Sequence, residues 1–348
     1  MSTFRVIFYS TKAYDETFFT KAKGKWEESK GIKFDFVFKT IRLTEETCDL
    51  AKGFDAVCIF VNDDGSAPVV RKLASIGVKL ILLRCAGFNN VDMKAAAAAR
   101  IPVMRVPRYS PNAVAEHAVT LLTALTRRIY RSHERVKNHN FALAGLEGFD
   151  IVHKTVGVIG TGAIGKIMCR IMRGFGSTVI AYDPRPDYKW AASLNVTYVP
   201  LNDLFKRADI ISLHVPLFKE NHHIINAKSI AMMKQDVTII NTARGGLIDT
   251  KAAIDGITSG KIRGLGIDVY ENEAEYFFKD HSMKPMKDPV LAHLISLPNV
   301  LMTGHQGFFT VDALIAISNT VMENILTFMA GKAYQSPNEC TGLFKPKL

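Results

Sequence analysis

A glycine-rich stretch in mid-chain has the residue types and the spacing that bind a dinucleotide. An apolar run at 155–159 leads into Gly160, Thr161, Gly162, Ala163, Ile164 and Gly165, and apolar residues then recur at helical spacing. A second apolar run, 177–182, ends on Asp183, 18 residues after Gly165. Strand, glycine turn, helix and terminal acid together predict a dinucleotide-binding unit, although a glycine turn can also occur in other α/β proteins.

Each part of this unit has a physical role. Gly160 permits the tight turn, Gly162 lets the backbone approach a pyrophosphate, and Gly165 lets the helix pack close to the strand. The amides and the positive end of the helix would then hold the diphosphate. Asp183 would accept hydrogen bonds from the ribose hydroxyls and repel a 2′-phosphate, so NAD is predicted over NADP. Arg185 weakens this preference, because an arginine there could bind a phosphate.

The bulk composition indicates a soluble protein of about two domains. The chain has 348 residues, of which 22% are charged and 48% hydrophobic, and it lacks a continuous apolar run of the roughly 18 residues that cross a bilayer. The N-terminus has no signal-peptide pattern, and five scattered cysteines fit reduced thiols. We therefore expect a cytoplasmic protein without a membrane partner. The last residues, Pro346, Lys347 and Leu348, leave a microbody location as the alternative.

The net charge of +11 raises the question of a polyanionic partner. Its densest part includes Arg127, Arg131 and Arg135, which recur at i, i+4 spacing along a predicted helix at 112–138. This spacing places them on one helical face and favours a solvated or subunit-contacting surface. No nucleic-acid partner is predicted.

Strands and helices alternate along the chain. The predicted strands are at 4–9, 34–38, 56–61, 80–83, 102–106, 155–159, 177–182, 208–214, 237–241 and 265–268, and further helices are predicted at 45–51, 67–76, 92–100 and 310–330. This order predicts an α/β protein of two domains. A Rossmann-type doubly wound parallel sheet (109–307) would be inserted into a flavodoxin-like α/β substrate domain (1–108 and 308–348).

Polar residues follow several of the strands predicted in the inserted domain. In a doubly wound sheet the carboxyl ends of the strands line the ligand crevice. The residues at these ends are therefore predicted to contact the cofactor. They are His214, Val215 and Pro216 after one strand, Thr242, Ala243 and Arg244 after the next, and Asp268 after a third.

The chain resembles the NAD-dependent D-isomer-specific 2-hydroxyacid dehydrogenases over almost its whole length. The likeness rests on the glycine motif with Asp183 and on the segments 241–245, 268–273 and 304–308. The segments 109–112 and 272–278 are similar to the lactate branch of that family. The resemblance implies reversible reduction of pyruvate to D-lactate with NADH, by a homodimer. It also implies that the amides of Ala86 and Gly87 bind the substrate carboxylate.

Reduction of a 2-oxo acid requires a hydride donor, a proton donor for the carbonyl oxygen and a cation for the carboxylate. His305 can donate the proton, because a histidine titrates near working pH. Glu273 can orient that ring and favour its charged form, and Arg244 can bind carboxylate or carbonyl oxygens with its planar fork. Arg244 and His305 would also border the cofactor. By resemblance, Asp268 would bind the nicotinamide carboxamide.

Several alternatives stay open at this point. By resemblance Tyr109 and Phe308 shape a pocket for a small side chain, but the same chemistry serves glyoxylate, hydroxypyruvate or a larger 2-oxo acid. An NAD-sensing, corepressor-like protein would share the fold. Glu271 and Glu275 lie close enough to Glu273 to compete for its role. No metal site is predicted, because the remaining histidines lack a ligand spacing and are interpreted as surface or packing residues: His117, His133, His139, His222 and His223.

Overall fold

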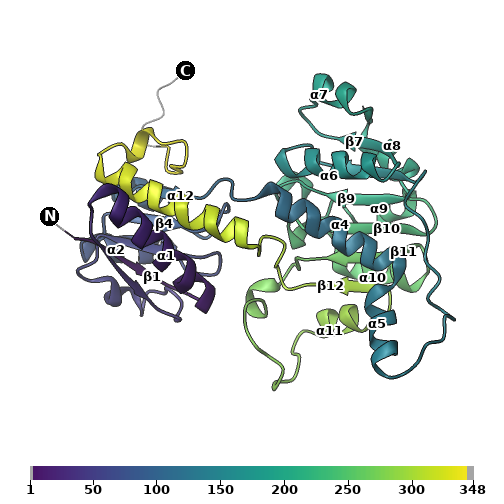
Figure 1. The fold of residues 1–348 in the computed structure, drawn as a ribbon, viewed down its shortest axis with the longest axis horizontal. Coiled ribbons are helices and arrows are strands. Elements are labelled where there is room, and N and C mark those ends of the chain that lie inside the picture. Colours follow the sequence, from purple (N-terminus) through teal and green to yellow (C-terminus); the bar gives the residue numbers. More distant parts are fainter. Residues whose placement is uncertain (1–2, 343–348) are drawn as a thin grey trace. The chain divides into compact units, whose positions relative to one another are not determined.

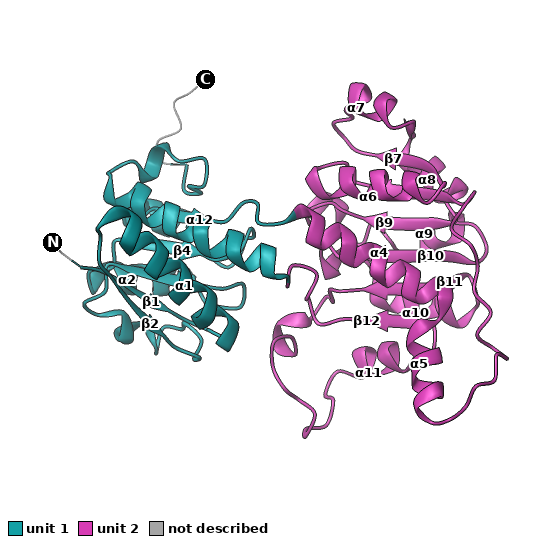
Figure 2. Ribbon diagram, in the orientation of Figure 1, with its two compact units in different colours: residues 1–110, 310–348 teal, residues 111–309 magenta. Residues whose placement is uncertain are grey.

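The chain folds into two compact units (Figure 1, Figure 2). The computed structural model describes residues 3–342, so the C-terminal tripeptide 346–348 lies outside the described residues. Unit 1 comprises Met1–Ser110 and Thr310–Leu348, and unit 2 comprises Pro111–Phe309. Each division lies two residues from the predicted boundary, because each falls where a helix begins: α4 (Pro111–Arg127) and α12 (Val311–Met329).

Unit 1 is built on a five-stranded sheet in which every pairing is parallel. The strand order is β2-β1-β3-β4-β5, which is the flavodoxin-like order. Its strands are β1 (Phe4–Phe8), β2 (Phe34–Phe38), β3 (Ala56–Ile59), β4 (Leu80–Leu83) and β5 (Val103–Arg105). Because β3 and β4 are buried along their whole length, they have the continuous apolar sequence of parallel strands.

The helices of unit 1 differ from prediction at η1 and α1 and in the additional short turn η5. They are α1 (Ala13–Lys30), η1 (Cys48–Ala51), α2 (Ala67–Ser75), α3 (Met93–Ala98), α12 and η5 (Ala333–Gln335). The helix predicted at 45–51 is only the short 3-10 turn η1. Helix α1 was not predicted, because its buried residues are just Asp15, Phe19 and Ala22 and it has no apolar stripe.

Helix α12 is the one helix among the described residues that is long and apolar enough to cross a membrane. Its apolar composition has another explanation, because it packs against α1, β4 and β5 within unit 1. Trp26 of α1 donates a hydrogen bond to Asn319 at 3.1 Å. The buried Asn324 donates to the carbonyl of Arg105 at 3.0 Å. These contacts are those of a core helix.

Unit 2 contains a seven-stranded parallel sheet in the order β12-β11-β10-β9-β6-β7-β8. Its strands are β6 (Thr155–Ile159), β7 (Thr178–Tyr182), β8 (Val196–Tyr198), β9 (Ile210–Leu213), β10 (Val237–Asn241), β11 (Ile262–Ile267) and β12 (Val300–Met302). The chain runs outward from β6 to β8 and then returns to place β9 on the other side of β6. This reversal is the topological switch point at which ligands bind in doubly wound folds.

Helices cover both faces of this sheet. They are α4, α5 (Ile129–Lys137), α6 (Ala163–Gly174), α7 (Tyr188–Ser193), α8 (Leu201–Arg207), α9 (Ala227–Met232), α10 (Thr250–Thr258) and α11 (Pro289–Ser296), with 3-10 turns η2 (Lys219–Asn221), η3 (Gly245–Leu247) and η4 (Glu273–Glu275). Neighbouring residues of β10 point to opposite sides. Ile240 joins the core formed with α4 and α6, and Ile239 joins the core formed with α8, α9 and α10.

The single long helix predicted at 112–138 is wrong. Arg128 has a left-handed backbone with φ of 49°, and this residue separates α4 from α5. Its guanidinium donates to the carbonyls of Gly145 and Glu147, both at 3.1 Å. The break therefore depends on a loop that returns to Arg128. It leaves Arg127 at the end of α4, while Arg131 and Arg135 lie on α5, so they do not share one continuous helical face.

Candidate active site

The glycine turn after β6 has the geometry that its sequence predicts. Gly160 adopts φ of 92°, and a Cβ there would lie 2.6 Å from the carbonyl oxygen of His214. A Cβ on Gly165 would lie 1.8 Å from the Gly160 carbonyl oxygen. Apart from Gly162 itself and its two chain neighbours, no described residue has an atom within 4 Å of a Cβ built on Gly162. Two glycines therefore permit close packing within the turn, and Gly162 faces open space where a ligand fits.

The turn and the acid at the end of β7 are joined by hydrogen bonds. Asp183 accepts from the amide of Thr161 at 2.7 Å and from its hydroxyl at 3.1 Å. The other oxygen of Asp183 accepts from the amide of Arg185 at 2.8 Å. Ala163 and Ile164 form the first turn of α6, which begins directly after Gly162. The predicted ribose-binding acid is thus held beside the predicted diphosphate-binding turn.

The end of β9 lies against this turn. The amide of His214 donates to the carbonyl of Ile159 at 2.8 Å, and its Nε2 lies 2.8 Å from the hydroxyl of Ser212. Nδ1 of His214 is buried without a hydrogen-bond partner among the described residues. Burial lowers the pKa of His214 to about 4, so the ring is neutral at physiological pH. Val215 and Pro216 follow it in an irregular segment.

The loop after β10 is organised by the buried side chain of Asn241. This amide donates to the carbonyl of Arg244 at 2.8 Å and accepts from the amide of Ala243 at 2.9 Å. The hydroxyl of Thr242 is buried and has no partner among the residues that the structure describes. The guanidinium of Arg244 donates to the Ala243 carbonyl at 2.6 Å, and no described carboxylate pairs with it. Arg244 can therefore bind an anion.

Glu273 and His305 follow the adjacent strands β11 and β12 and form a hydrogen-bonded pair. Nδ1 of His305 lies 2.8 Å from one oxygen of Glu273, and the side chains are only 21% and 23% exposed. The other oxygen of Glu273 accepts from the amide of Tyr270 at 3.0 Å. Glu271 contacts Thr250 and His223 instead. Of the three neighbouring acids, the structure therefore pairs Glu273 with His305.

His305 has a left-handed backbone, with φ of 56°. This conformation is uncommon for a residue with a side chain and requires support from its surroundings. Support comes from Asp268, whose carbonyl accepts from the His305 amide at 2.8 Å. The carboxylate of Asp268 accepts from the amides of Gln306 at 2.8 Å and Gly307 at 2.7 Å. Asp268 therefore fixes the loop that carries His305.

Two residues that the sequence did not assign to the site complete this network. The hydroxyl of Thr303 donates to Asp268 at 2.5 Å, and Nε2 of His117 lies 2.9 Å from that hydroxyl and 3.4 Å from Asp268. Burial alone would raise the pKa of Asp268, but hydrogen bonds from His117, Thr303 and two loop amides lower it overall. His117 lies on α4, over 150 residues before Asp268 in the sequence, so residue spacing could not predict their contact.

Unit 1 contains the predicted carboxylate loop, at the end of β4. The carbonyl of Ala86 accepts from the guanidinium of Arg105 at 3.0 Å, and that guanidinium lies over the ring of Phe88. Because a trans peptide directs its C=O and N–H to opposite sides, the Gly87 amide points away from Arg105. Among the described residues none accepts from the amides of Ala86 or Gly87. Their binding of a carboxylate stays a prediction.

The two predicted pocket residues belong to different units. Tyr109 follows β5 in unit 1 and is partly buried. Phe308 follows Gly307 in unit 2, and its ring lies 6.0 Å from the ring of Phe309. A Cβ on Gly307 would lie 3.0 Å from Asp268, so this glycine allows the loop to pass close to the carboxylate. Their contacts with a substrate stay predictions.

The polar groups of unit 2 fit a nicotinamide dinucleotide. The open space at Gly162 suits a diphosphate, and Asp183 lies beside it for a ribose. The unpartnered buried atoms of His214 and Thr242 lie at the ends of β9 and β10, farther along the same sheet edge. Buried polar atoms normally have partners, so their lack of one is consistent with ligand contacts. Asp268 fixes the loop that carries His305. Its predicted contact with the nicotinamide carboxamide is a separate role that stays a prediction.

Comparison with known proteins identifies the family. Residues 119–307 match the model of the D-isomer specific 2-hydroxyacid dehydrogenase NAD-binding domain. The chain belongs to the D-isomer specific 2-hydroxyacid dehydrogenase family and is an NAD-dependent dehydrogenase. The predicted fold class, family and cofactor are thereby confirmed, and the enzyme hypothesis is favoured over a corepressor-like binding protein.

Particular relatives match over nearly their full length. The chain is 48% identical to the D-lactate dehydrogenase of Escherichia coli (strain K12), over 95% of this chain and 98% of the relative. A structure of the pyruvate reductase of Chlamydomonas reinhardtii is 42% identical, with a TM-score of 0.88 over 95% of this chain and 97% of that chain. The NAD-complexed D-isomer specific 2-hydroxyacid dehydrogenase from Lactobacillus delbrueckii ssp. bulgaricus is 30% identical, with a TM-score of 0.79 over 97% and 99%.

The neutral state of His214 predicts a pH dependence of stability. Its pKa is about 4 in the folded chain, while an unfolded histidine titrates near 6.5. As pH falls from about 6.5 to 4, this histidine is protonated in the unfolded chain but not in the folded one. The free energy of unfolding of unit 2 therefore falls by up to about 1.4 kcal/mol per pH unit because of this group. His214→Asn should reduce this slope, and the exposed His153→Asn should not. Hydrogen exchange of β6 amides at several pH values would measure it. Equal slopes in wild type and His214→Asn would contradict a buried neutral ring.

Proposed function

We propose that this dehydrogenase reduces pyruvate to D-lactate with NADH and catalyses the reverse oxidation. The observation that carries the proposal is the hydrogen-bonded Glu273–His305 pair. It follows β11 and β12, while Arg244 follows the adjacent β10 without a carboxylate partner among the described residues. An acid–base pair and an anion-binding cation at one edge of an NAD-binding sheet suit the reduction of a 2-oxo acid.

The side chains divide the chemistry between them. Glu273 contacts Nδ1 of His305, and no described residue hydrogen-bonds Nε2, which leaves that nitrogen to exchange a proton with the substrate oxygen. The planar guanidinium of Arg244 would bind the substrate carboxylate or the charge that develops on the carbonyl oxygen. NADH, when bound, supplies the hydride. In oxidation the neutral His305 would accept the proton from the hydroxyl group.

The names of the relatives support pyruvate as the substrate. The E. coli relative is a D-lactate dehydrogenase and the Chlamydomonas relative a pyruvate reductase. Another solved structure, 34% identical with a TM-score of 0.84, is a D-2-hydroxyisocaproate dehydrogenase. Glyoxylate, hydroxypyruvate and larger 2-oxo acids therefore remain the alternative substrates.

We also infer that the enzyme is a homodimer joined through unit 2. Exposed apolar side chains gather on α5 and the loop that follows it: Ile129, Val136, Phe141 and Leu143 are 58%, 45%, 72% and 81% exposed. Figure 1 shows α5 on the side of unit 2 that carries β12 and α11. Exposed apolar patches of this kind mark protein interfaces.

We propose the cytoplasm as the compartment, which imaging of the tagged chain would test.

The proposed reaction predicts a substrate order and a product configuration. With NADH, pyruvate should give a higher kcat/KM than glyoxylate, hydroxypyruvate or a branched 2-oxo acid, and chiral chromatography should find D-lactate. NADPH should be a poorer donor, because its 2′-phosphate would meet Asp183. L-lactate as the product, or a larger 2-oxo acid as the best substrate, would reject the proposal.

Loss of the Glu273 carboxylate should impair catalysis more than cofactor binding. Glu273→Gln removes the charge that orients and stabilises the protonated His305, so kcat for pyruvate should fall about 100-fold. The NADH dissociation constant should change by less than about threefold, because the glycine turn lies elsewhere in the sheet. Glu275→Gln is the matched control, since Glu275 is exposed on the same turn. A comparable fall in kcat in both variants would contradict the proposed role of Glu273.

The dimer proposal predicts a change in mass. Replacing Phe141 and Leu143 together by Asp should place charges in the interface and give a monomer by light scattering at micromolar concentration. Phe218→Asp is the control, because Phe218 is 59% exposed in unit 2 but outside this segment. A wild-type monomer, or a doubly substituted chain that stays dimeric, would overturn the assignment of this surface.

A further inference from the structure

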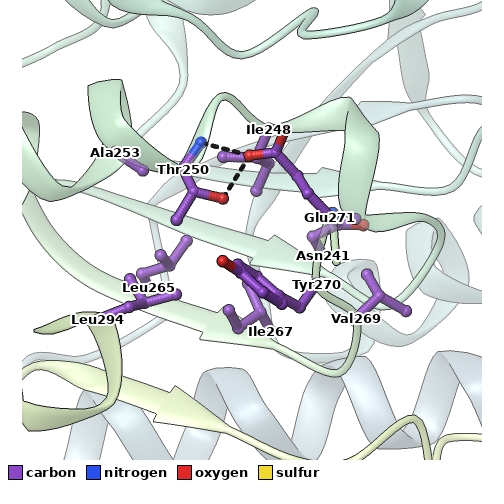
Figure 3. Close-up of a pocket in the computed structure, with 11 residues that line it drawn as sticks. Asn241, Ile248, Thr250, Ala253, Leu265, Ile267, Val269, Tyr270, Glu271 and Leu294 are labelled. Atoms are coloured by element: carbon purple, nitrogen blue, oxygen red, sulfur yellow. Dashed lines mark hydrogen bonds between the residues drawn. The ribbon is translucent and has the colours of Figure 1, made fainter. Parts of the chain in front are cut away.

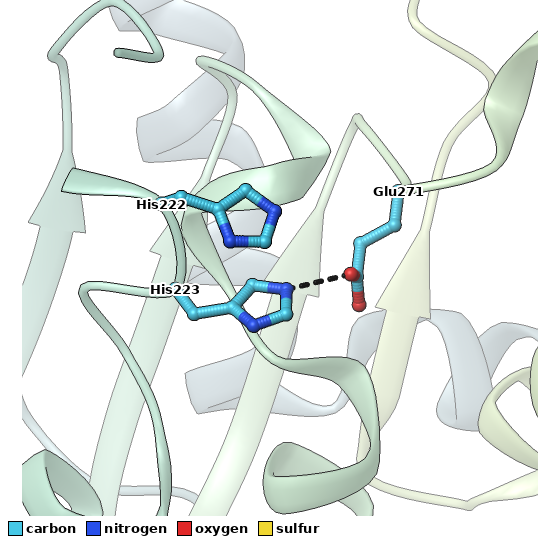
Figure 4. Close-up of side chains that lie close together, drawn as sticks. All are labelled: His222, His223 and Glu271. Carbon is cyan, nitrogen blue, oxygen red and sulfur yellow. Dashed lines mark hydrogen bonds and ion pairs between the residues drawn. The ribbon is translucent and has the colours of Figure 1, made fainter. Parts of the chain in front are cut away.

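Three side chains outside the dehydrogenase site form a ligand set for a metal ion. We propose that His222, His223 and Glu271 bind one divalent transition-metal ion, with Zn²⁺ the best suited. Each residue offers one ligand atom, and these three atoms lie within 4.8 Å of one another (Figure 4). Sequence spacing gave no sign of this site, because Glu271 is 48 residues from His223.

The backbone presents both imidazoles on the same side. Successive side chains of an extended chain point in opposite directions, but His223 adopts a left-handed conformation with φ of 52°. Its amide donates to the carbonyl of Gly246 at 2.8 Å, which fixes this turn. The two rings are stacked, with centroids 3.8 Å apart and planes inclined by 31°. Figure 4 shows both rings beside the Glu271 carboxylate.

Glu271 is oriented before any ion arrives. One of its oxygens accepts from the Thr250 amide at 2.9 Å and hydroxyl at 2.5 Å, as Figure 3 shows. The other oxygen lies 2.7 Å from Nε2 of His223. Thr250 and Glu271 border a cavity of about 10 Å³ that is otherwise lined mostly by apolar side chains. The two bonds from Thr250 hold the first oxygen, and the second is directed toward His223. Such outer hydrogen bonds are the usual support of metal ligands.

The ligand types select the class of ion. Two imidazoles and one carboxylate suit Zn²⁺, Co²⁺ or Ni²⁺, whereas Mg²⁺ and Ca²⁺ prefer oxygen ligands. Three protein ligands leave a fourth position for water. Ligand atoms around tetrahedral Zn²⁺ are roughly 3.3 Å apart. His223 and Glu271 must therefore separate slightly from 2.7 Å as the ion replaces their hydrogen bond.

The site is accessible and is linked to the segment that carries Glu273. The side chains of His223 and Glu271 are 31% and 25% exposed, so an ion can enter from solvent. A Cβ on Gly245 would lie 2.1 Å from the carbonyl carbon of Tyr270 and 2.4 Å from the Glu271 nitrogen. A bound ion would therefore join the 222–223 turn to a segment already packed against the Arg244 loop. We expect it to stabilise unit 2.

Calorimetry on the full chain tests the proposal. Protein treated with EDTA and then dialysed should bind one Zn²⁺ per chain, and the melting temperature should rise with Zn²⁺ concentration. His223→Asn tolerates the left-handed backbone but removes the ligand, and it should weaken binding at least about tenfold, as should His222→Asn and Glu271→Gln. His153→Asn is the matched control, because His153 is exposed and has φ of 65°.

Each outcome decides the question. Zn²⁺ binding that is lost in the three ligand variants and kept in His153→Asn, all with wild-type circular dichroism, supports the site. Binding that persists in His223→Asn and Glu271→Gln would place the ion elsewhere, and no heat of binding at 100-fold molar excess would overturn the proposal. If a ligand variant misfolds, anomalous diffraction from wild-type crystals soaked in Zn²⁺ decides: a peak between the three side chains supports the site, and its absence rejects it.

Discussion

The arrangement of the active site depends on one buried carboxylate. Asp268 is 1% exposed, and a charge taken out of water is stable only when hydrogen bonds replace its solvent. The replacements come from the amides of Gln306 and Gly307 and from the hydroxyl of Thr303, with His117 beside them. All of these except His117 belong to the segment around His305. The need to satisfy Asp268 therefore also fixes the loop that carries His305, the proposed proton donor.

The parallel sheet determines where such groups can meet. Every strand of unit 2 ends at the same edge, so residues far apart in sequence become neighbours when their strands are adjacent. Arg244, Glu273 and His305 follow β10, β11 and β12, which are consecutive in the sheet. The glycine turn and His214 follow β6 and β9, which flank the switch point. The predicted cofactor-binding residues and the proposed acid–base residues thus occupy successive positions along one edge.

The bounds of several strands could be predicted from the local sequence. The strands β2, β4, β6 and β10 begin and end where predicted, because each is a short apolar run bounded by turn residues. Contacts from residues farther along the chain determine two features that were missed. Arg128 breaks the predicted long helix by binding carbonyls of a returning loop, and α1 is stabilised partly by α12 from the far end of the chain. Residue types singled out Arg244 and His305 as candidates, but they could not show that His117 and Thr303 contact Asp268, which fixes the loop of His305.

The choice among three acids illustrates the same limit. Glu271, Glu273 and Glu275 alternate along the chain, and in a strand all three would face one side. The backbone instead changes conformation at Asn272, and η4 begins at Glu273. This change turns Glu271 toward Thr250 and His223 and Glu273 toward His305, so two separate histidine–carboxylate pairs form. His305 lies in the loop that Asp268 fixes, whereas His223 lies in a left-handed turn whose amide donates to the carbonyl of Gly246. Residues distant in sequence therefore place each histidine, and its position decides which acid it pairs with.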